Sequence, residues 1–277
     1  MIEIIKAIIL GIVEGITEWL PISSTGHMIL VDEFLQLSMS DEFKEMFFVV
    51  IQLGAIMAVV ILYWNKLFPF SFKEKPFIKE KTFIMWFKIV VASIPAAIVG
   101  ILFEDELNAL FYNYFSVALA LIVFGILFIV IENQNKGKQA RIRTIDDITY
   151  QTAVIIGLFQ LIAAVFPGTS RSGATILGAI LIGVSRKTAT EFTFFLAVPA
   201  MFGASLIKLL KFGFDFNSLE ITVLLIGMLV AFIVSVIVIK FFTDYIKKHN
   251  FKIFGWYRIV LGCIVILYFF VKTLVMN

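Results

Sequence analysis

Long apolar blocks without a charged residue alternate with short polar segments along the chain. The blocks at 49–64, 115–131 and 221–239 are clear cases. Each approaches the roughly 20 residues that an α-helix needs to cross the hydrocarbon core of a membrane. Apolar and polar residues do not alternate along them, as they do in the strands of a membrane β-barrel. The pattern therefore predicts six transmembrane helices, near 47–64, 84–103, 114–132, 188–210, 220–242 and 253–273.

Two further apolar stretches, 4–36 and 151–184, are interrupted in the middle by Pro, Ser, Thr and Gly. Pro21 and Pro167 mark the interruptions, because a proline ends a helix at the residue before it. The hydroxyl groups that follow each proline can cap a new helix. Each stretch therefore predicts a broken helical hairpin rather than a full crossing.

The two broken hairpins are related in sequence. Their prolines lie 167 − 21 = 146 positions apart, and three spans follow each hairpin. At the same offset, small and polar residues of the first stretch align with counterparts in the second: Gly11 with Gly157, Glu14 with Gln160 and Ser24 with Ser170. We therefore expect a single membrane domain, 1–277, with a first repeat at 1–135 and a second at 147–277.

An odd number of crossings in each repeat gives the second repeat the opposite orientation. Basic residues agree with this, because they gather in the loops after the first, third and fifth spans: Lys66, Lys73, Lys75, Lys79, Lys81, Lys136, Lys138, Arg141, Arg143, Lys247, Lys248 and Lys252. The positive-inside rule then puts both termini outside. This is the inverted-topology plan, in which interrupted helices meet near the midplane and form the site. The expected fold is an all-α integral membrane protein with six transmembrane helices and two re-entrant helical hairpins.

The composition also indicates a membrane protein. Hydrophobic residues make up 61% of the chain and charged residues 16%, whereas about a quarter of a globular domain is charged. The net charge of +3 is modest, and the lysines and arginines are scattered along the chain rather than gathered in one basic patch. Both features argue against nucleic acid as a partner. Ionisable groups at membrane depth are costly and mark functional sites. This directs attention to Glu14, Glu18, His27 and Arg171 in the broken hairpins.

Glu14 and Glu18 are one helical turn apart, so both carboxylates project from one face of a short helix. Two like charges at this distance repel each other in a low dielectric unless a cation lies between them. A hard divalent cation, Mg2+ or Ca2+, suits such a pair of oxygen ligands. The alternative is an interfacial helix with two solvated glutamates.

The segment PISSTGH follows directly, at 21–27. If Ser23 or Ser24 caps the next helix, the free backbone N–H groups of that helix point at the break and form an anion site. Ser24 and His27 are three residues apart and within reach across the first turn, so the imidazole can act as a general base for the hydroxyl. The alternative role of these hydroxyls is helix capping and close packing.

The second break carries PGTSRSGAT, at 167–175. Gly168 allows close approach of the backbone, and Arg171 provides a forked cation suited to phosphate. Pairing of Arg171 with Glu14 or Glu18 in the empty site is the structural alternative. Arg258 lies close to a helix end, from which its side chain can extend to the interface. The hydroxyl groups of this segment include those of Ser170, Ser172 and Thr175.

These motifs resemble those of the undecaprenyl-diphosphate phosphatase family, also called the bacitracin-resistance family. Its signatures are E-x-x-x-E leading into P-x-S-S-T-G-H, and P-G-x-S-R-S-G-x-T. Both are present without departure, at 14–27 and 167–175. The resemblance implies removal of the terminal phosphate of undecaprenyl diphosphate, a polyprenyl lipid, which regenerates the carrier for cell-wall synthesis and confers bacitracin resistance. It also implies an enzyme of the bacterial inner (plasma) membrane that needs a divalent cation and opens to the outer side.

The resemblance further implies roles for individual residues, by motif position. Glu14 and Glu18 serve the metal or proton transfer, and Ser24 and His27 serve the attack on phosphorus. The residues implied to hold the diphosphate are Ser23, Thr25, Gly26, Gly168, Ser170, Arg171, Ser172 and Thr175.

Two other functions are also compatible with this sequence. An inverted-repeat site of this kind also suits a lipid-phosphate flippase, although a carrier needs no nucleophile. A third hypothesis is a drug-resistance protein that only sequesters lipid. The sequence leaves open whether Ser24 or a water attacks, whether Mg2+ or Ca2+ is used, whether the protein forms a homodimer, and how chain length is discriminated.

Overall fold

The computed structural model describes residues 1–71 and 77–276. Within these ranges, six helices are long and apolar enough to cross a membrane. They confirm the predicted spans and are α3 (Asp41–Leu62), α5 (Glu80–Leu102), α7 (Tyr114–Gln134), α10 (Arg186–Phe212), α11 (Ser218–Lys248) and α12 (Lys252–Met276). Lys73 and Lys75 of the basic first loop lie outside the described residues.

Both predicted interruptions are present, because Pro21 and Pro167 each lie in a turn between two short helices. Pro95 and Pro199, by contrast, lie inside α5 and α10 without ending them, as neighbouring helices allow in a membrane bundle. The helices of the two hairpins are α1 (Ile2–Thr17), α2 (Ser24–Phe34), α8 (Tyr150–Val165) and α9 (Arg171–Leu181). Two short helices, α4 (Trp64–Leu67) and α6 (Glu104–Phe111), connect longer ones.

Side-chain caps explain where several helices begin. α11 starts with a reciprocal capping box between Asn217 and Glu220. A cap of this kind stabilises a helix by about 1 kcal/mol, because it gives a partner to an N–H group that the helix leaves free. Four other helices, α3, α7, α8 and α10, are each capped by the side chain of one residue, which accepts a backbone hydrogen bond. These residues are Ser40, Asn113, Thr149 and Ser185, respectively.

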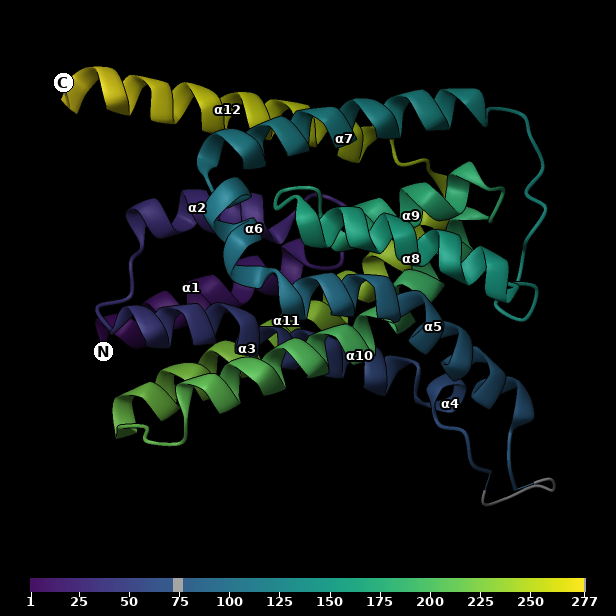
Figure 1. Ribbon diagram of the computed structural model, residues 1–277, viewed down its shortest axis with the longest axis horizontal. Coiled ribbons are helices and arrows are strands. Elements are labelled where there is room, and N and C mark those ends of the chain that lie inside the picture. The colour runs from purple at the N-terminus through teal and green to yellow at the C-terminus, as the bar shows by residue number, and fades with distance from the viewer. Residues whose placement is uncertain (72–76, 277) are drawn as a thin grey trace.

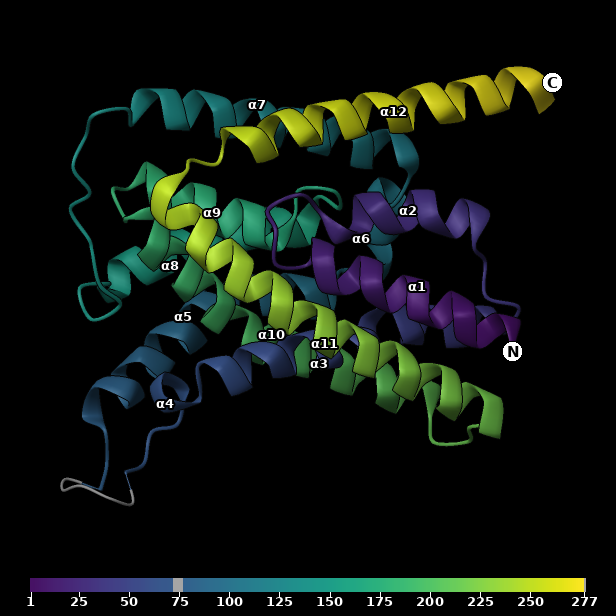
Figure 2. The same cartoon turned by 180° about the vertical axis from the view of Figure 1, so that it is seen from behind.

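The long helices run roughly along the longest axis of the molecule (Figure 1). α7 and α12 lie side by side along one edge, and α3, α10 and α11 form the opposite layer (Figures 1 and 2). The two hairpins lie between these layers. Both chain termini are at one end of the molecule, and the basic segment 134–149 is at the other end (Figure 1).

The hairpins open toward opposite ends of the molecule, and their turns face each other near its middle (Figure 1). α1 and α2 open toward the end with the termini, whereas α8 and α9 open toward the end with segment 134–149. Ser172 at the start of α9 fixes the meeting point, because its hydroxyl donates to the carbonyl oxygens of Glu18 and Leu20 in the other turn. An inverted repeat requires such an arrangement; the repeat itself and the re-entry of the hairpins into a membrane stay predictions.

Each hairpin packs on a long helix through a glycine. A Cβ atom at Gly11 of α1 would lie 2.7 Å from the carbonyl oxygen of Gly227 in α11, and one at Gly157 of α8 would collide with the carbonyl of Ala92 in α5. Small residues let helix backbones approach closely in membrane proteins. The two glycines are related by the 146-residue offset, so the same close contact occurs in both halves of the chain.

Rows of exposed apolar side chains run along the outer helices. On α11, Leu225, Leu229, Ile233 and Ile237 follow one another at every fourth position and are 49–63% exposed. A water-soluble protein rarely leaves such a continuous apolar patch uncovered. The row therefore agrees with helices that contact lipid.

Candidate active site

The two turns place a serine in the same strained conformation at the start of α2 and α9. Ser23 has φ 73° and Ser170 has φ 68°, and in the described chain they are the non-glycine residues with positive φ. Each caps its helix by accepting a hydrogen bond from the N–H three residues ahead, of Gly26 and Gly173 respectively. Such strain costs about 1–3 kcal/mol and persists where the surroundings enforce it, commonly at functional sites.

This geometry corrects the alignment of the two motifs by one residue. The sequence offset paired Ser24 with Ser170, whereas the two caps pair Ser23 with Ser170, at 170 − 23 = 147 positions. The reason is that the segment from Pro167 to its cap is one residue longer than the segment from Pro21. Arg171 therefore occupies in α9 the position that Ser24 occupies in α2. Of the two predicted caps for α2, the structure selects Ser23, which leaves the Ser24 hydroxyl free for other contacts.

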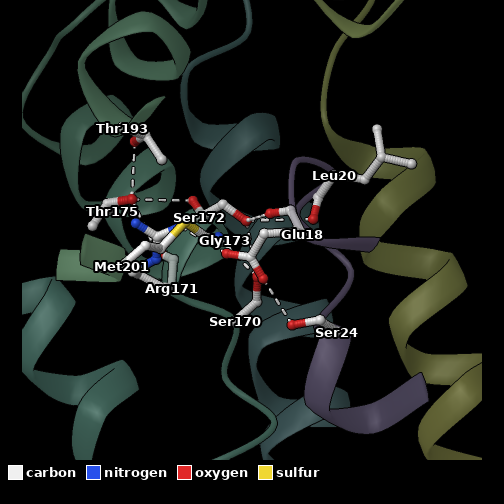
Figure 3. Close-up of polar contacts among 10 residues, drawn as sticks. All are labelled: Glu18, Leu20, Ser24, Ser170, Arg171, Ser172, Gly173, Thr175, Thr193 and Met201. Atoms are coloured by element: carbon white, nitrogen blue, oxygen red, sulfur yellow. Dashed lines mark hydrogen bonds and ion pairs between the residues drawn. The ribbon is translucent and has the colours of Figure 1, made fainter. Parts of the chain in front are cut away.

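Glu18 is the centre of the polar contacts between the turns (Figure 3). One of its carboxylate oxygens, Oε2, accepts a hydrogen bond of 2.9 Å from Ser24 Oγ. The other, Oε1, forms an ion pair of 2.7 Å with Nη2 of Arg171. The carboxylate is buried, so both contacts act in a low dielectric, where charged hydrogen bonds are strong. A hydroxyl, a carboxylate and a guanidinium from two hairpins thus form one connected group.

The expected hydrogen bond between Ser24 and His27 is not among the contacts of the described residues. The imidazole turns away from Ser24: its Nδ1 lies 2.7 Å from the carbonyl oxygen of Ser23, and its Nε2 lies 2.7 Å from the hydroxyl of Tyr257 on α12. A carbonyl oxygen can only accept, so Nδ1 carries a hydrogen, and in the neutral imidazole Nε2 then accepts from Tyr257. The hydrogen-bond acceptor of Ser24 is Glu18 instead.

Arg258 corrects a second expectation. Its side chain does not extend to an interface but is fully buried. The guanidinium donates to the carbonyl oxygens of Pro21 in the first turn, at 3.3 Å, and of Gly168 and Thr169 in the second, at 2.9 and 2.7 Å. Sequence position near a helix end gave no sign of this, because the partners are backbone groups far away in the chain. Arg258 ties the two turns together and places a positive charge behind them.

The other predicted binding residues lie at different places around the two turns. Ser170 and Ser172 share a hydrogen bond of 3.1 Å at the meeting of the turns. Thr175 is fully buried, and its hydroxyl donates to the Arg171 carbonyl and lies 2.9 Å from the Thr193 hydroxyl, so it supports the start of α9. Thr25 and Gly26 lie in the first turn of α2, and Gly168 has φ 91°.

Five buried polar atoms in the two turns or on the helices beside them have no partner among the described residues. They are Oε1 of Glu14, Nε1 of Trp19, Oε1 of Gln160, Oγ1 of Thr169 and Nη1 of Arg171. A buried polar atom without a hydrogen bond is destabilising by about 1–3 kcal/mol, so unsatisfied groups clustered in one region indicate a ligand. Glu14 and Gln160 are also counterparts at the 146-residue offset.

The carboxylates fit a divalent cation only together with the substrate. In the described residues there is no cluster of three or more His, Cys, Asp or Glu side chains that could hold a metal. Mg2+ is commonly held by one or two carboxylates together with substrate phosphates and waters. Glu14, with its unpartnered Oε1, and Glu18, one turn away, fit that ligand set.

Comparisons with known proteins agree with these motifs. A family model described as bacitracin resistance protein BacA matches residues 7–264. The chain is 68% identical over 275 residues to an undecaprenyl-diphosphatase of Desulfitobacterium hafniense, with 99% of each chain covered. It is 67% identical over 270 residues to undecaprenyl-diphosphatase 1 of Clostridium acetobutylicum, with 98% of each chain covered. An undecaprenyl-diphosphatase of Enterococcus faecalis is 66% identical over 268 residues, covering 96% of this chain and 97% of that one.

Proposed function

The chain belongs to the BacA family of bacitracin resistance proteins, and from that premise we propose that it hydrolyses undecaprenyl diphosphate to undecaprenyl phosphate and inorganic phosphate. It is a multi-pass bacterial membrane enzyme. Its lipid product returns to cell-wall synthesis as the carrier, and its activity confers bacitracin resistance. The observation that carries the proposal is the contact of Ser24 and Arg171 with one carboxylate, that of Glu18.

The meeting of the two turns is suited to bind a diphosphate. α2 and α9 both begin there, and the N-terminus of a helix attracts anions through its free N–H groups and its dipole. Arg171 adds a guanidinium whose Nη1 has no protein partner, and a guanidinium can bind two phosphate oxygens at once. Arg258 adds a second positive charge, which is fully buried. The substrate's phosphate displaces Glu18 from Arg171 when it binds.

Ser24 is the nucleophile in this proposal, and Glu18 is its base. The Ser24 oxygen forms a bond to the terminal phosphorus while its proton passes to Glu18 Oε2, across the existing 2.9 Å hydrogen bond. The bond from that phosphorus to the bridging oxygen breaks, and undecaprenyl phosphate leaves. A water then cleaves the phosphoserine, releases inorganic phosphate and restores the hydroxyl. Arg171 stabilises the charge on the phosphoryl oxygens during both steps.

His27 and Tyr257 support this arrangement. His27 donates through Nδ1 to the carbonyl of Ser23, whose strained backbone caps α2. Tyr257 in turn donates to Nε2 and so fixes the tautomer of the imidazole. Through these contacts the pair holds Ser24, the next residue along the chain, in place.

A divalent cation, held by Glu14 and Glu18, is part of the proposal. When bound, it would neutralise charge on the diphosphate, as metal ions do in phosphoryl transfer. The unpartnered Oε1 of Glu14 supports this. A set of two carboxylates suits Mg2+ better than Ca2+, because Ca2+ prefers sites with more oxygen ligands from the protein.

The site belongs, in this proposal, to an inverted repeat with re-entrant hairpins that opens to the outer side of the membrane. The opposite directions of the two hairpins support the repeat (Figure 1). The basic loops at the end away from the termini support an outside location of both termini.

Release of inorganic phosphate from undecaprenyl diphosphate by the purified protein in detergent tests the activity. We expect turnover with release of one phosphate for each lipid. Movement of lipid between the leaflets of proteoliposomes without phosphate release would instead support the flippase hypothesis.

A further inference from the structure

A cavity of about 610 Å3 opens between α5, α8 and α10, with α3 and α6 at its margins. Most of its wall is apolar and made of small residues: Ala96, Ala97, Gly100, Ala163, Ala200 and Gly203. We name the space lined by these residues the alanine groove. Small side chains leave room for a ligand, and a volume of roughly 300–1,000 Å3 is typical of sites for small ligands.

The inner end of the alanine groove is polar and adjoins the proposed active site. Gln160 and Arg171 line it there. Both side chains keep a buried atom without a partner in the described chain, Oε1 of Gln160 and Nη1 of Arg171. Arg171 also contacts Glu18, which contacts Ser24. The groove is therefore continuous, through Arg171, with the group that is proposed to act on phosphorus.

The outer end of the groove carries charges that balance each other. Glu104, the first residue of α6, pairs with Lys208 at 3.0 Å and with Lys211 at 3.2 Å. Lys208 also pairs with Glu45. Two cations and two carboxylates leave no surplus charge to attract a free anion. Together with the apolar wall, this favours a hydrocarbon chain over inorganic phosphate as the occupant.

We propose that the alanine groove binds the part of the polyprenyl chain next to the diphosphate. Gln160 and Nη1 of Arg171 then face the phosphate nearest the chain, and the terminal phosphate lies toward Ser24 and Nη2 of Arg171. The proposal rests on the proposed function, because it names where that substrate's chain lies. The groove takes only a short stretch of the chain, and the remainder stays in the bilayer.

The groove acts by position rather than by hydrophobic transfer. A prenyl chain is already in an apolar environment in the membrane, so its entry into a groove gains little from leaving water. The groove instead holds the prenyl units next to the diphosphate in a fixed position, and this places the terminal phosphorus within reach of Ser24. Displacement of a reacting group by about 1 Å can lower a rate about a hundredfold.

Two glycines allow the groove to be filled without a collision. A Cβ atom at Gly100 on α5 or at Gly203 on α10 meets nothing within 4 Å. Gly203→Leu and Gly100→Leu therefore place side chains in the groove from two different helices. Leucine is also a better helix former than glycine, so both variants should fold. Leu206→Phe is the matched control, since Leu206 lies on the same helix as Gly203 but is 59% exposed on the outside of the molecule.

The test is the kcat/KM of these variants for undecaprenyl diphosphate and for isopentenyl diphosphate, which has a single prenyl unit. For both leucine variants we expect kcat/KM to fall about tenfold or more with the long substrate, and to stay within about twofold of wild type with the short one, as for other clashes in apolar pockets. Leu206→Phe should match wild type with both. Unchanged kinetics of the leucine variants would overturn the proposal. An equal fall in kcat/KM with both substrates would also overturn it. Such a result would mean that the leucine side chains block the access of phosphate or water rather than the place of the prenyl chain.

A binding measurement separates failure of this proposal from failure of the proposed function. Gly203→Cys is made in a Cys263→Ala, Ser24→Ala background, and its alkylation by N-ethylmaleimide is followed in detergent. Undecaprenyl diphosphate should slow alkylation at position 203 and leave a Leu206→Cys control unaffected, whether or not the wild type releases phosphate. Equal alkylation at position 203 with and without the lipid contradicts the proposal. Absence of phosphate release by the wild type, with protection at position 203, would reject only the proposed hydrolysis.

Discussion

Arg171 at the start of α9 and Glu18 at the end of α1 form a partly buried ion pair of 2.7 Å that joins the two hairpins. The residues are 153 positions apart in the chain. Pairing of this arginine with Glu14 or Glu18 was one of two roles that the sequence left open. In the structure, Glu18 binds Arg171 and also accepts the hydrogen bond of Ser24. In the proposed function, a phosphate that takes the guanidinium from Glu18 therefore frees the carboxylate that accepts the hydrogen bond of Ser24.

Replacement of Arg171 tests whether geometry or charge matters. Arg171→Lys keeps a positive charge but cannot bind two phosphoryl oxygens in a plane. We expect kcat to fall by about a hundredfold or more, because the loss is felt in the transition state. The melting temperature should change little, since an ammonium can still pair with Glu18. Arg141→Lys, in an exposed loop, is the control; a kcat of Arg171→Lys near the wild-type value would show that charge alone suffices.

Arg258 should be needed for both stability and turnover. Lysine at this position cannot reach the carbonyls of Pro21, Gly168 and Thr169 together, so Arg258→Lys leaves buried acceptors without donors. Each such acceptor destabilises the protein by about 1–3 kcal/mol, which predicts a lower melting temperature in detergent. Because the two turns also lose their common anchor, kcat should fall by about tenfold or more even at temperatures where the variant is folded. A variant with wild-type kcat but a lower melting temperature would limit Arg258 to a structural role.

Removal of divalent cations should abolish hydrolysis, and Mg2+ should restore it, because Glu14 and Glu18 offer hard oxygen ligands. Glu14→Gln removes one charged ligand, so more Mg2+ should be needed for half-maximal activity. Glu33→Gln, whose carboxylate pairs with Lys272, serves as a control and should titrate like wild type. Full activity of exhaustively stripped protein in excess chelator would contradict the metal site.

The orientation in the membrane can be read from cysteine labelling in a Cys263→Ala background. A cysteine placed in the exposed part of segment 104–113 should react with an impermeant maleimide on intact cells. A cysteine in segment 136–143 should react only after permeabilisation, because the basic loops are expected inside. The reverse pattern would place the first hairpin on the cytoplasmic side.

Much of the fold could be predicted from sequence because membrane spans depend on the composition of one continuous segment. The helix breaks at Pro21 and Pro167 could be predicted because proline acts locally. The polar residues of both breaks could be recognised as one site because their chemistry is unusual in an apolar chain. Glu18, Ser24 and Arg171 indeed meet.

The details that the sequence could not supply depend on three-dimensional contacts. The cap at Ser23 rather than Ser24 follows from a segment between proline and cap that is one residue shorter in the first turn than in the second, which a fixed offset between prolines conceals. The partner of Ser24 depends on the direction in which the His27 ring turns, and Tyr257, 230 positions away, helps to set that direction. Arg258 contacts backbone carbonyls, which no residue pattern reveals.

The most direct test of this account is a trap for the phosphoserine. Wild-type protein is mixed with undecaprenyl diphosphate radiolabelled in its terminal phosphate, quenched in acid within the first turnover, and digested for peptide mapping. The account predicts label on the peptide that contains Ser24, no label with Ser24→Ala, and kcat of Ser24→Ala reduced at least about a thousandfold, as expected when a nucleophile is removed. Attack by water predicts the opposite: no labelled peptide at any time, and a Ser24→Ala variant that keeps a tenth or so of its turnover because it loses a single hydrogen bond.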